Sequence, residues 1–553
     1  MRTLLFLALA SACSSPLHAA SATHAEVAHY AGKLLADNYT GDGAGAAILV
    51  TRGDEVLFRG ARGLADVKAH RALTPDDVFR IGSVSKQFAA AGLLTLVESG
   101  KVALEDPLSK YLPGFPNAQH ITVRQLLNHT SGVKSYTSIA SIIDGPMDKD
   151  LSTAQLIATF QDAKPDFAPG EDWAYNNSGY VLVGAVIEAA SGQPWHEYLR
   201  SALFEPLGLS HTGYGGDPRA ARLQVHGYSQ DDGKFVAPRD ISMTVPHAAG
   251  ALLSTVDDLM KWNRALHEGR VLKSTSYAQM MAPTGKAIDH NYGFGIEQDA
   301  VRGQATLGHS GGIFGFASML SYVQGPDVSV VVLQNSDSNK DKDAPEVLAR
   351  KLVAAALGQP YPLPVAIAVD AATLKQLEGV YPVDEKSARV LRVVDGALTS
   401  QRTGGPRATL VPIGKDEFLF LDGLNRFTVD RDAAGVVIGM RFFAEGDAPG
   451  VVVKRATAVL PADRQEVALP QLAVERVLGM YQSGDQHMKV FQDGKQLKAE
   501  MAGQPAVDLF AQSPTLFFLT VVDATLEFKE GHTPAAGMTL VQGDNTMEFT
   551  RVR

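Results

Sequence analysis

The sequence predicts an α/β (α+β) domain with a helical lobe, followed by two small antiparallel β-barrel domains. In roughly the first two thirds of the chain, strand-like and helical segments lie at both ends and mainly helical patterns lie between them. A proline-rich linker follows at residues 359–364, and beyond it short alternating strands are punctuated by Gly, Asp and Pro. We therefore expect domains at residues 23–360, 365–460 and 465–553.

Length and charge support several domains and argue against some partners. The chain has 553 residues, which is too long for one ordinary domain. Its net charge is -10 and its Lys and Arg residues form no run, so nucleic acid and anionic membrane surfaces are poor partners. We expect no transmembrane segment, because no stretch beyond the N-terminal segment is long and apolar enough. The sequence does not predict the oligomeric state.

Residues 1–22 have the pattern of a secretory signal peptide. One basic residue, Arg2, precedes the apolar stretch 4–10, and small residues continue to the end of the segment. We expect export, to the periplasm or outside the cell. Cys13 is the only cysteine and lies in a loose lipobox pattern, so a lipid anchor there is the alternative. Disulfides, a cysteine nucleophile and thiolate metal sites are not expected elsewhere in the chain.

Periodicity predicts the elements of the first domain in order. A helical pattern covers residues 26–39, and strands at 46–51 and 55–61 form a hairpin through Arg52-Gly53-Asp54. A helix start with the pattern of a capping box lies at 254–258. The other expected elements are helices at 121–128, 179–190 and 344–357, and strands at 305–309, 316–323 and 328–334.

The region after the linker repeats itself. Three short motifs recur about 100 residues later: residues 377–381 as 477–481, 395–396 as 493–494, and 439–440 as 537–538. We expect two copies of one small β-barrel, separated near residues 461–470, with no helix after the first turn of this region.

Ser83 and Lys86 form the candidate catalytic pair. Residues three apart on a helix are neighbours, so the amine would lie beside the hydroxyl. A serine needs a base to take its proton, and a lysine can do this if burial keeps it neutral. The same spacing occurs at Ser131 and Lys134, but Gly132 and the preceding turn disfavour a helix there. Taken alone, Ser83 could equally be a helix N-cap.

Two further stretches carry groups that a serine–lysine pair needs. Tyr175 and Asn177 are two residues apart, and alternate side chains of an extended segment point the same way. His309 is followed by Gly311 and Gly312 at the end of a predicted strand, where a substrate backbone could lie close. Each group alone has an ordinary explanation, as a core aromatic, a turn asparagine or a turn histidine. No metal-ligand spacing occurs, so we expect neither a metal nor another cofactor.

Together, these stretches resemble the three signature motifs of the β-lactamase and penicillin-binding serine hydrolase family. Ser83-x-x-Lys86, Tyr175-Asn176-Asn177 and His309-Ser310-Gly311 have the order and separation of its class C-like branch. Residues 126–132 and 292–295 also resemble recurrent segments of that branch, and the match covers roughly residues 26–357. The resemblance implies a serine β-lactamase-like catalytic domain.

The resemblance also implies roles for the residues that react. Ser83 would attack a carbonyl carbon and form an acyl-enzyme, while Lys86 and Tyr175 share the proton transfers. Backbone N–H groups of Ser83 and Gly312 would form the oxyanion hole. His309 would face the leaving group or a substrate carboxylate.

Substrate binding is implied for a second set of residues. Asn177 would hold a substrate amide and assist Lys86, and the substrate would lie along Gly311 and Gly312. A histidine in place of the family's lysine lowers the positive charge at neutral pH, which weakens the case for a carboxylate-dependent β-lactamase.

The layout of one catalytic domain and two β-barrels is most similar to that of bacterial D-aminopeptidases. We therefore expect an exported serine hydrolase acting on D-amino-acid amides or small peptides, with peptidoglycan fragments as one source. In those enzymes a long loop from the last barrel selects a free substrate amine, whereas residues 517–528 leave only a short connection. The alternatives are an esterase, β-lactamase or D,D-peptidase on the same residues, or a cell-wall-binding protein with a vestigial catalytic lobe.

Overall fold

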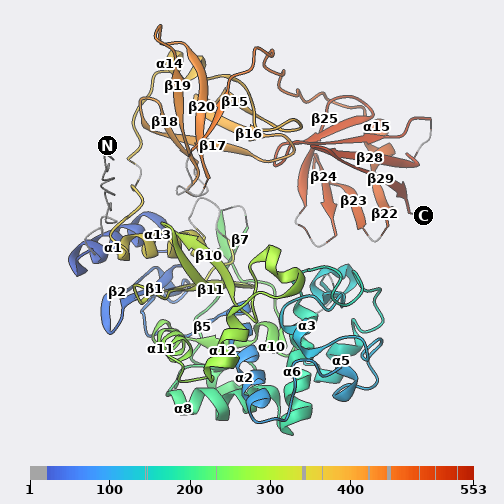
Figure 1. The fold of residues 1–553 in the computed structure, drawn as a ribbon. Coiled ribbons are helices and arrows are strands. Elements are labelled where there is room, and N and C mark those ends of the chain that lie inside the picture. The colour runs from blue at the N-terminus through green and yellow to red at the C-terminus, as the bar shows by residue number, and fades with distance from the viewer. Residues whose placement is uncertain are drawn as a thin grey trace, which may run out of the picture.

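A six-stranded antiparallel sheet organises the N-terminal domain, with the strand order β10-β11-β12-β13-β1-β2 (Figure 1). Its strands are β1 (Ala46–Arg52), β2 (Glu55–Arg62), β10 (Glu297–Val301), β11 (Gln304–Ile313), β12 (Phe316–Val323) and β13 (Val328–Gln334). Strands β13 and β1 are neighbours in the interior of the sheet and are buried on both faces. Ile48 and Val50 of β1 pack with the helices α1 (His24–Asn38) and α13 (Pro345–Ala356), whereas Leu49 faces the core of the helical lobe.

This computed structural model describes residues 22–143, 145, 147–231, 233–338, 344–363, 365–420, 424–444, 450–484, 486–502, 504, 506–531 and 534–552. The predicted signal peptide, except Ala22, and the predicted lipid site at Cys13 lie outside these residues. Within them, each helix is too short or too polar to cross a membrane.

The predicted hairpin is confirmed, because β1 and β2 pair antiparallel through a turn at Gly53. Gly53 has a φ of 54°, a conformation that glycine adopts without a steric penalty. The predicted terminal helices are present as α1 and α13. Strand β11 differs from the prediction: it continues past His309 to Ile313, because its last residues pair with β12. Gly311 and Gly312 therefore lie inside a strand.

Two buried helices, α2 (Ser85–Glu98) and α6 (Asn177–Ser191), form the centre of the helical lobe. Both are apolar almost all round, which is typical of helices enclosed by protein. Helices predicted at 121–128 and 254–266 are found as α3 (Val123–Leu127) and α11 (Val256–His267). The other helices are α4 (Ala140–Ile143), α5 (Thr153–Ala158), α7 (Trp195–Leu199), α8 (Glu205–Leu207), α9 (Pro218–Ala221), α10 (His247–Gly250) and α12 (Ser274–Met281).

The residues beyond the linker form two eight-stranded sheets. The first comprises β14 (Gly379–Pro382), β15 (Ala388–Val394), β16 (Ala397–Arg402), β17 (Arg407–Gly414), β18 (Glu417–Phe420), β19 (Arg426–Arg431), β20 (Val437–Phe443) and β21 (Val451–Lys454). The second comprises β22 (Gly479–Ser483), β23 (Gln486–Asp493), β24 (Gln496–Met501), β25 (Val507–Ala511), β26 (Leu516–Leu519), β27 (Ala524–Phe528), β28 (Gly537–Gln542) and β29 (Asn545–Arg551). Pairing of β22 with β29 closes the second barrel. The first is nearly closed, and the Ala456 N–H donates to the Val380 carbonyl across its seam.

The sequence repeat corresponds to one hydrogen bond used in both barrels. The buried hydroxyl of Tyr381 donates to the Leu377 carbonyl, and that of Tyr481 donates to the Val477 carbonyl, each at 2.8 Å. A short helix precedes each tyrosine, α14 (Ala371–Gln376) and α15 (Gln471–Val477). The prediction of no further helix was wrong for α15. Its seven residues are too few to show a helical period in the sequence, and the packing of Val477 in the barrel core holds this helix in place.

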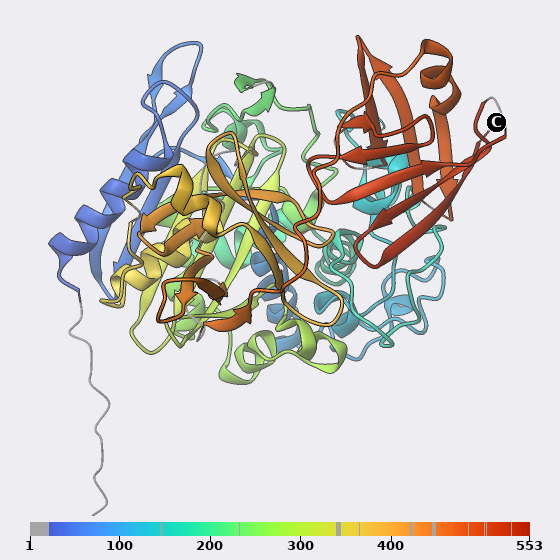
Figure 2. The same cartoon turned by 90° about the horizontal axis from the view of Figure 1, so that it is seen from above.

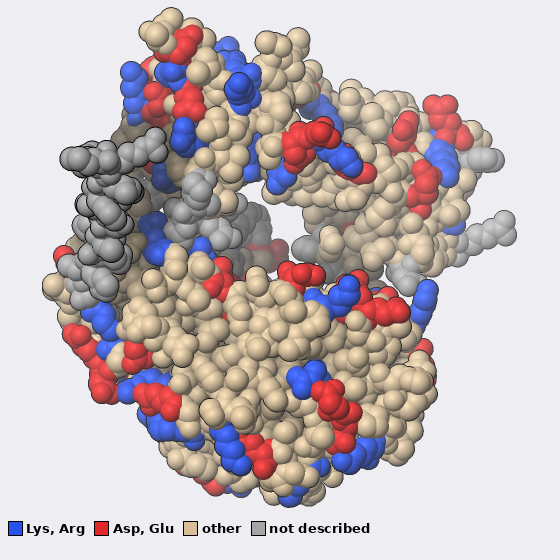
Figure 3. Space-filling model, in the orientation of Figure 1, with Lys and Arg blue, Asp and Glu red and all other residues tan. Residues whose placement is uncertain are grey.

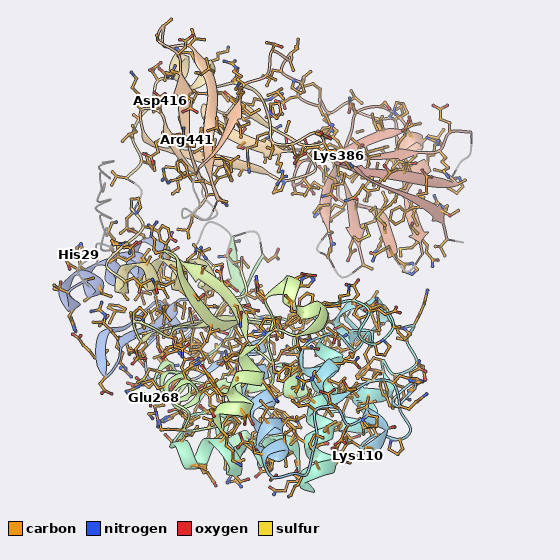
Figure 4. All side chains as sticks on the ribbon, in the orientation of Figure 1. His29, Lys110, Glu268, Lys386, Asp416 and Arg441 are labelled. Carbon is orange, nitrogen blue, oxygen red and sulfur yellow. The ribbon has the colours of Figure 1, made fainter. Side chains whose placement is uncertain are left out.

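The barrels contact each other and lie over the N-terminal domain (Figure 2). Between them, the Gly404 N–H donates to Asp523 Oδ2, and Gln542 Nε2 donates to the Gly404 carbonyl. Leu424 of the first barrel joins the core between the sheet and α1 and α13. An opening separates the barrels from the N-terminal domain in Figure 3, and charges of both signs are mixed over the visible face. Charged residues such as Lys110 and Glu268 point outward from the filled interior (Figure 4).

Candidate active site

Ser83 lies in a short 3-10 turn, Gly82–Val84, directly before α2. Gly82 has a φ of 48°. A Cβ on Gly82 would lie 2.8 Å from the Gly312 nitrogen, and a Cβ on Gly311 would lie 2.2 Å from the Ile81 carbonyl oxygen. The two glycines therefore allow the serine turn and strand β11 to approach without intervening side chains.

Lys86, in the first turn of α2, meets three oxygen atoms. Its Nζ lies 3.0 Å from Ser83 Oγ, 2.8 Å from Asn177 Oδ1 and 2.9 Å from the Ala249 carbonyl oxygen. The last two oxygens only accept, so they can take up both N–H groups of a neutral amine. The lone pair of that amine is then left for the Ser83 hydroxyl, which donates to it.

Burial keeps this amine neutral. The Lys86 side chain has no exposed surface, and desolvation holds its pKa well below the ordinary value of 10.5. The negative charge of Glu297 acts in the opposite direction, with the smaller effect. Lys86 can therefore accept a proton without first losing one.

Tyr175 and Asn177 converge on Lys86 from the start of α6. The Tyr175 ring centroid lies 4.7 Å from Lys86 Nζ, and Ser83 is close enough to lower the pKa of the Tyr175 hydroxyl in part. Tyr175 keeps 37% of its surface exposed. Burial raises the pKa of Tyr175, which the Ser83 contact only partly offsets, so the group is a protonated phenol at neutral pH.

The sequence predicted an extended segment at Asn177. In the structure, Asn177 is instead the first residue of α6. Its neighbour Asn176 is the N-cap and accepts from the Gly179 N–H. The Asn177 Nδ2 donates to Thr137 Oγ1 at 3.1 Å, which turns Oδ1 toward Lys86. The amide is therefore held in one orientation.

The register of β11 turns one backbone N–H toward the serine. Strand β10 pairs with β11 only as far as Gly308, which leaves the following residues of that edge open. Ile313 and Phe316 close the hairpin with β12, so at the next pair the Gly312 N–H points away from β12. Gly312 can thus supply one oxyanion-hole donor, with the Ser83 N–H as the other.

His309 is the residue expected to face the leaving group or a substrate carboxylate. Its side chain is 1% exposed, with Nε2 2.8 Å from the Tyr292 hydroxyl and Nδ1 2.6 Å from the Ser310 carbonyl oxygen. A carbonyl only accepts, so Nδ1 carries the hydrogen and the Tyr292 hydroxyl donates to Nε2. Burial lowers the pKa of His309, so the ring is neutral. In this geometry it links β11 to Tyr292, and its ring centroid lies 6.1 Å from that of Tyr175.

A cavity of about 370 Å³ opens beside Ser83. Its walls come from the helical lobe, the segment before α10 and the hairpin of β11 and β12, and comprise Ser83, Tyr136, Thr137, Ile143, Met147, Asn177, Ile241, Pro246, Ala249, Gly250, Gly312, Ile313, Phe314 and Asp337. Phe314 thus lines the cavity, whereas Tyr292 and Phe294 are buried in the core. None of these described lining residues comes from the barrels, and β26 connects to β27 through residues 520–523 alone.

Several residues of the site were not predicted from the sequence. Ala249 contributes a backbone oxygen, which leaves no side-chain signal. Thr137 orients Asn177, and Glu297 and Asp337 place carboxylates near the reacting groups from distant parts of the chain. Among the residues that the structure describes, no three His, Cys, Asp or Glu side chains gather as metal ligands.

The second serine–lysine pattern is separate from the site. Lys134 forms an ion pair with Asp166 at 2.7 Å and is partly exposed. Gly132, between Ser131 and Lys134, has a φ of 71°, so the segment is not helical. Of the two patterns, Ser83 and Lys86 are therefore the pair at the start of a helix, as the local sequence context predicted.

Comparison with known proteins identifies the family. Residues 31–355 match the family described as Beta-lactamase. The chain belongs to the beta-lactamase family. With the Ser83–Lys86 contact in place, it is a serine hydrolase of the β-lactamase and penicillin-binding superfamily, as the resemblance predicted.

Among relatives of this beta-lactamase-family chain, Penicillin-binding protein 4* of Bacillus subtilis (strain 168) is 27% identical over 425 residues, covering 70% of the chain and 90% of that protein. A D-aminopeptidase of Gluconobacter oxydans (strain 621H) is 27% identical over 328 residues, covering 58% of the chain and 60% of the relative. The alignment thus spans less than two thirds of that D-aminopeptidase.

Solved structures share the fold. The D-amino acid amidase from Ochrobactrum anthropi SV3, in complex with D-phenylalanine, superposes with a TM-score of 0.51 and 26% identity, covering 56% of this chain and 91% of the amidase. A penicillin-binding protein homologue from Pyrococcus abyssi has a TM-score of 0.55 and 24% identity, covering 78% and 99%. The second likeness concerns the fold alone.

Proposed function

We propose that this enzyme hydrolyses amides of D-amino acids and short D-peptides through an acyl-enzyme on Ser83. The observation that carries the proposal is the fully buried Lys86, whose two carbonyl partners leave its lone pair for the Ser83 hydroxyl. The names of the D-aminopeptidase relative and the D-amino acid amidase support the choice of substrate class.

In the acylation step, Ser83 Oγ bonds to the substrate carbonyl carbon while its proton passes to Lys86. The carbonyl oxygen becomes an oxyanion between the N–H groups of Ser83 and Gly312, and each such donor typically contributes about 3–4 kcal/mol. Tyr175 gives its proton to the leaving nitrogen as the C–N bond breaks, and Lys86 returns a proton to Tyr175. The amine leaves and both groups regain their starting state.

Deacylation reverses these proton movements with water as the nucleophile. Lys86 takes a proton from water as the water oxygen attacks the ester carbonyl, and Ser83 leaves with that proton. The products are the free acid and the resting enzyme, so each cycle consumes one water.

The charges near the third motif favour amide substrates without a carboxylate at the leaving group. Glu297 Oε2 accepts from the Ser310 N–H at 3.3 Å, and Glu297 Oε1 lies 3.6 Å from His309 Nδ1. A neutral His309 beside this carboxylate offers no positive charge to a second carboxylate. This arrangement supports an amidase or aminopeptidase over a carboxylate-dependent β-lactamase or D,D-carboxypeptidase.

We also propose that the enzyme works outside the cytoplasm on fragments derived from peptidoglycan. Residues 1–22 have the composition of an export signal, and D-amino acids are the substrate class that the site residues are proposed to accept. Loss of secretion on deletion of residues 1–22 would support this location.

The deciding experiment compares D-alanine p-nitroanilide with its L-enantiomer and includes covalent labelling of Ser83 by a fluorophosphonate. We expect D-selective turnover and labelling, both lost in Ser83→Ala. Labelling without turnover of either anilide would overturn the amide substrate and favour the esterase alternative. Absence of labelling in a folded protein would favour a vestigial site.

A further inference from the structure

The cavity beside Ser83 has one ionised wall residue. Among its described lining residues, Asp337 is the only Asp, Glu, Lys or Arg, and the groups around it are largely aliphatic or aromatic, with Ile143, Met147 and Phe314 as examples. A single carboxylate in a largely apolar cavity is the kind of polar group that fixes the orientation of a ligand.

The Asp337 carboxylate is held in place from one side. Its Oδ2 accepts from Ser229 Oγ and from the Gly315 N–H, both at 2.7 Å. Its Oδ1 accepts from none of the described residues, and no Lys, Arg or His nitrogen among them lies within ion-pair distance. The carboxylate is therefore positioned, and its Oδ1 has no hydrogen-bond donor among the described residues.

The cavity receives the acyl part of the substrate. Tyr175, which protonates the leaving nitrogen in the proposed mechanism, is absent from the described lining, whereas Ser83, Asn177 and Gly312 are part of it. The leaving group thus lies on the Tyr175 side and the acyl group on the cavity side. Asp337 is fixed by Gly315, in the same hairpin that presents Gly312.

From this placement we infer that Asp337 selects substrates whose acyl part carries a positively charged amine. The inference rests on the proposed acyl-enzyme function and assigns a specificity residue to it. The amine would be the α-amine of the acyl residue or the amine of its side chain, since both present the same ammonium group to a carboxylate. The N-terminal domain would thereby supply amine recognition without any barrel loop.

Three p-nitroanilides separate the two sources of the amine: D-leucine p-nitroanilide with an α-amine, Nα-acetyl-D-lysine p-nitroanilide with a side-chain amine, and Nα-acetyl-D-leucine p-nitroanilide with neither. We expect kcat/KM for one of the first two to exceed that of the third by about 10-fold, the scale of one charged hydrogen bond. In Asp337→Asn this ratio should fall to about 1. Because the ratio is taken within each variant, a general loss of activity cancels.

Two control variants sharpen the result. Asp162→Asn removes an exposed carboxylate outside the cavity and should leave the ratio unchanged. Ser229→Ala removes one donor to Asp337 but keeps its charge, so its effect should be smaller than that of Asp337→Asn. This variant also tests the inference if Asp337→Asn fails to fold.

The inference is overturned if the doubly neutral substrate is cleaved as fast as both amine-bearing ones, or if Asp337→Asn keeps the wild-type ratio. In either case turnover of Nα-acetyl-D-leucine p-nitroanilide would leave the proposed function standing. If no anilide is cleaved, the proposed function fails and the inference falls with it.

Discussion

The N-terminal domain and the two barrels bury polar groups with different results. In the N-terminal domain, Lys86, His129 and His309 cluster around the nucleophile, and desolvation lowers the pKa of each. In the barrels, Tyr381 and Tyr481 each donate to a carbonyl four residues earlier. In the N-terminal domain, desolvation yields a reactive amine beside a cavity. In the barrels, the buried tyrosine hydroxyls hold the first strand of each barrel to the residues that precede it. Reactivity therefore depends on what a buried group faces.

Replacement of the nucleophile should give the largest difference between matched positions. Ser83→Ala should reduce kcat/KM by at least about 1000-fold, because Ser83 carries the one hydroxyl within hydrogen-bond distance of Lys86 Nζ among the described residues. Ser131→Ala, in the second serine–lysine pattern, should keep activity. Steady-state kinetics with a D-amino-acid anilide would measure both. Equal losses in the two variants would mean that the site is misassigned.

Replacement of the base should cost less. Lys86→Met keeps the length of the side chain but removes the proton acceptor, and a general base typically contributes about 100- to 10,000-fold. The rate of Ser83 labelling by a fluorophosphonate should fall by that order while the protein still melts cooperatively. Lys134→Met should label at the wild-type rate. Normal labelling of Lys86→Met would remove this residue from the mechanism.

Removal of the barrels tests whether the two regions are independent. A chain truncated after Leu363 should remain folded, because both cores of the N-terminal domain are complete except for Leu424. The loss of one buried leucine should lower the free energy of unfolding by about 2–3 kcal/mol. Leu424→Ala in the full chain should lower the stability of the N-terminal domain comparably. A truncated chain without a cooperative melt would show that the barrels are integral to the core.

The repeated tyrosine should affect stability alone. Tyr381→Phe and Tyr481→Phe each remove a buried hydroxyl that donates to a carbonyl, at a cost of about 1 kcal/mol, and Tyr481→Phe also removes the acceptor of an Arg551 hydrogen bond. Chemical denaturation would detect this change, and kcat/KM should stay at the wild-type value. A fall in activity in either variant would connect that barrel to the site.

The smallest expected effect is a shift in the pH profile. Lys86 acts as a base only when neutral, so kcat/KM should persist at neutral pH and fall as the pH drops through its lowered pKa. Glu297 raises that pKa, so Glu297→Gln should move the acid limb to lower pH. Nα-acetyl-D-leucine p-nitroanilide suits the measurement because it does not titrate there. A limb that moves to higher pH would contradict the assignment of Lys86.

The sequence predicted those site residues whose spacing is short or whose motif is local. Ser83 and Lys86 are one turn apart, and Tyr175 and Asn177 meet them through a segment with its own recognisable pattern. The hairpin of β1 and β2 and the repeat of the barrels could also be predicted, because their sequence patterns are local. The end of β11 was not predictable in this way. This strand extends beyond His309 because it pairs with β12, and the sequence of one segment does not show that pairing.

Groups that act from a distance could not be predicted. Ala249 contributes a carbonyl oxygen, and any residue type could supply that atom. Glu297 and Asp337 look like ordinary surface carboxylates until the fold brings them near Lys86 and the cavity. The contact of His309 with Tyr292 could not be predicted either, because the two residues lie in separate segments that the fold brings together.

The close approach of Gly82 and Gly311 has a consequence for how this enzyme can change. A side chain at either position would collide with the backbone of the opposing segment. Substitution of either glycine should therefore disrupt the site. The cavity walls carry no such constraint: Ile143, Met147 and Ile241 come from the helical lobe and can vary in size without moving the serine turn. Directed evolution of this scaffold should therefore widen the range of accepted acyl groups while the reaction itself stays the same.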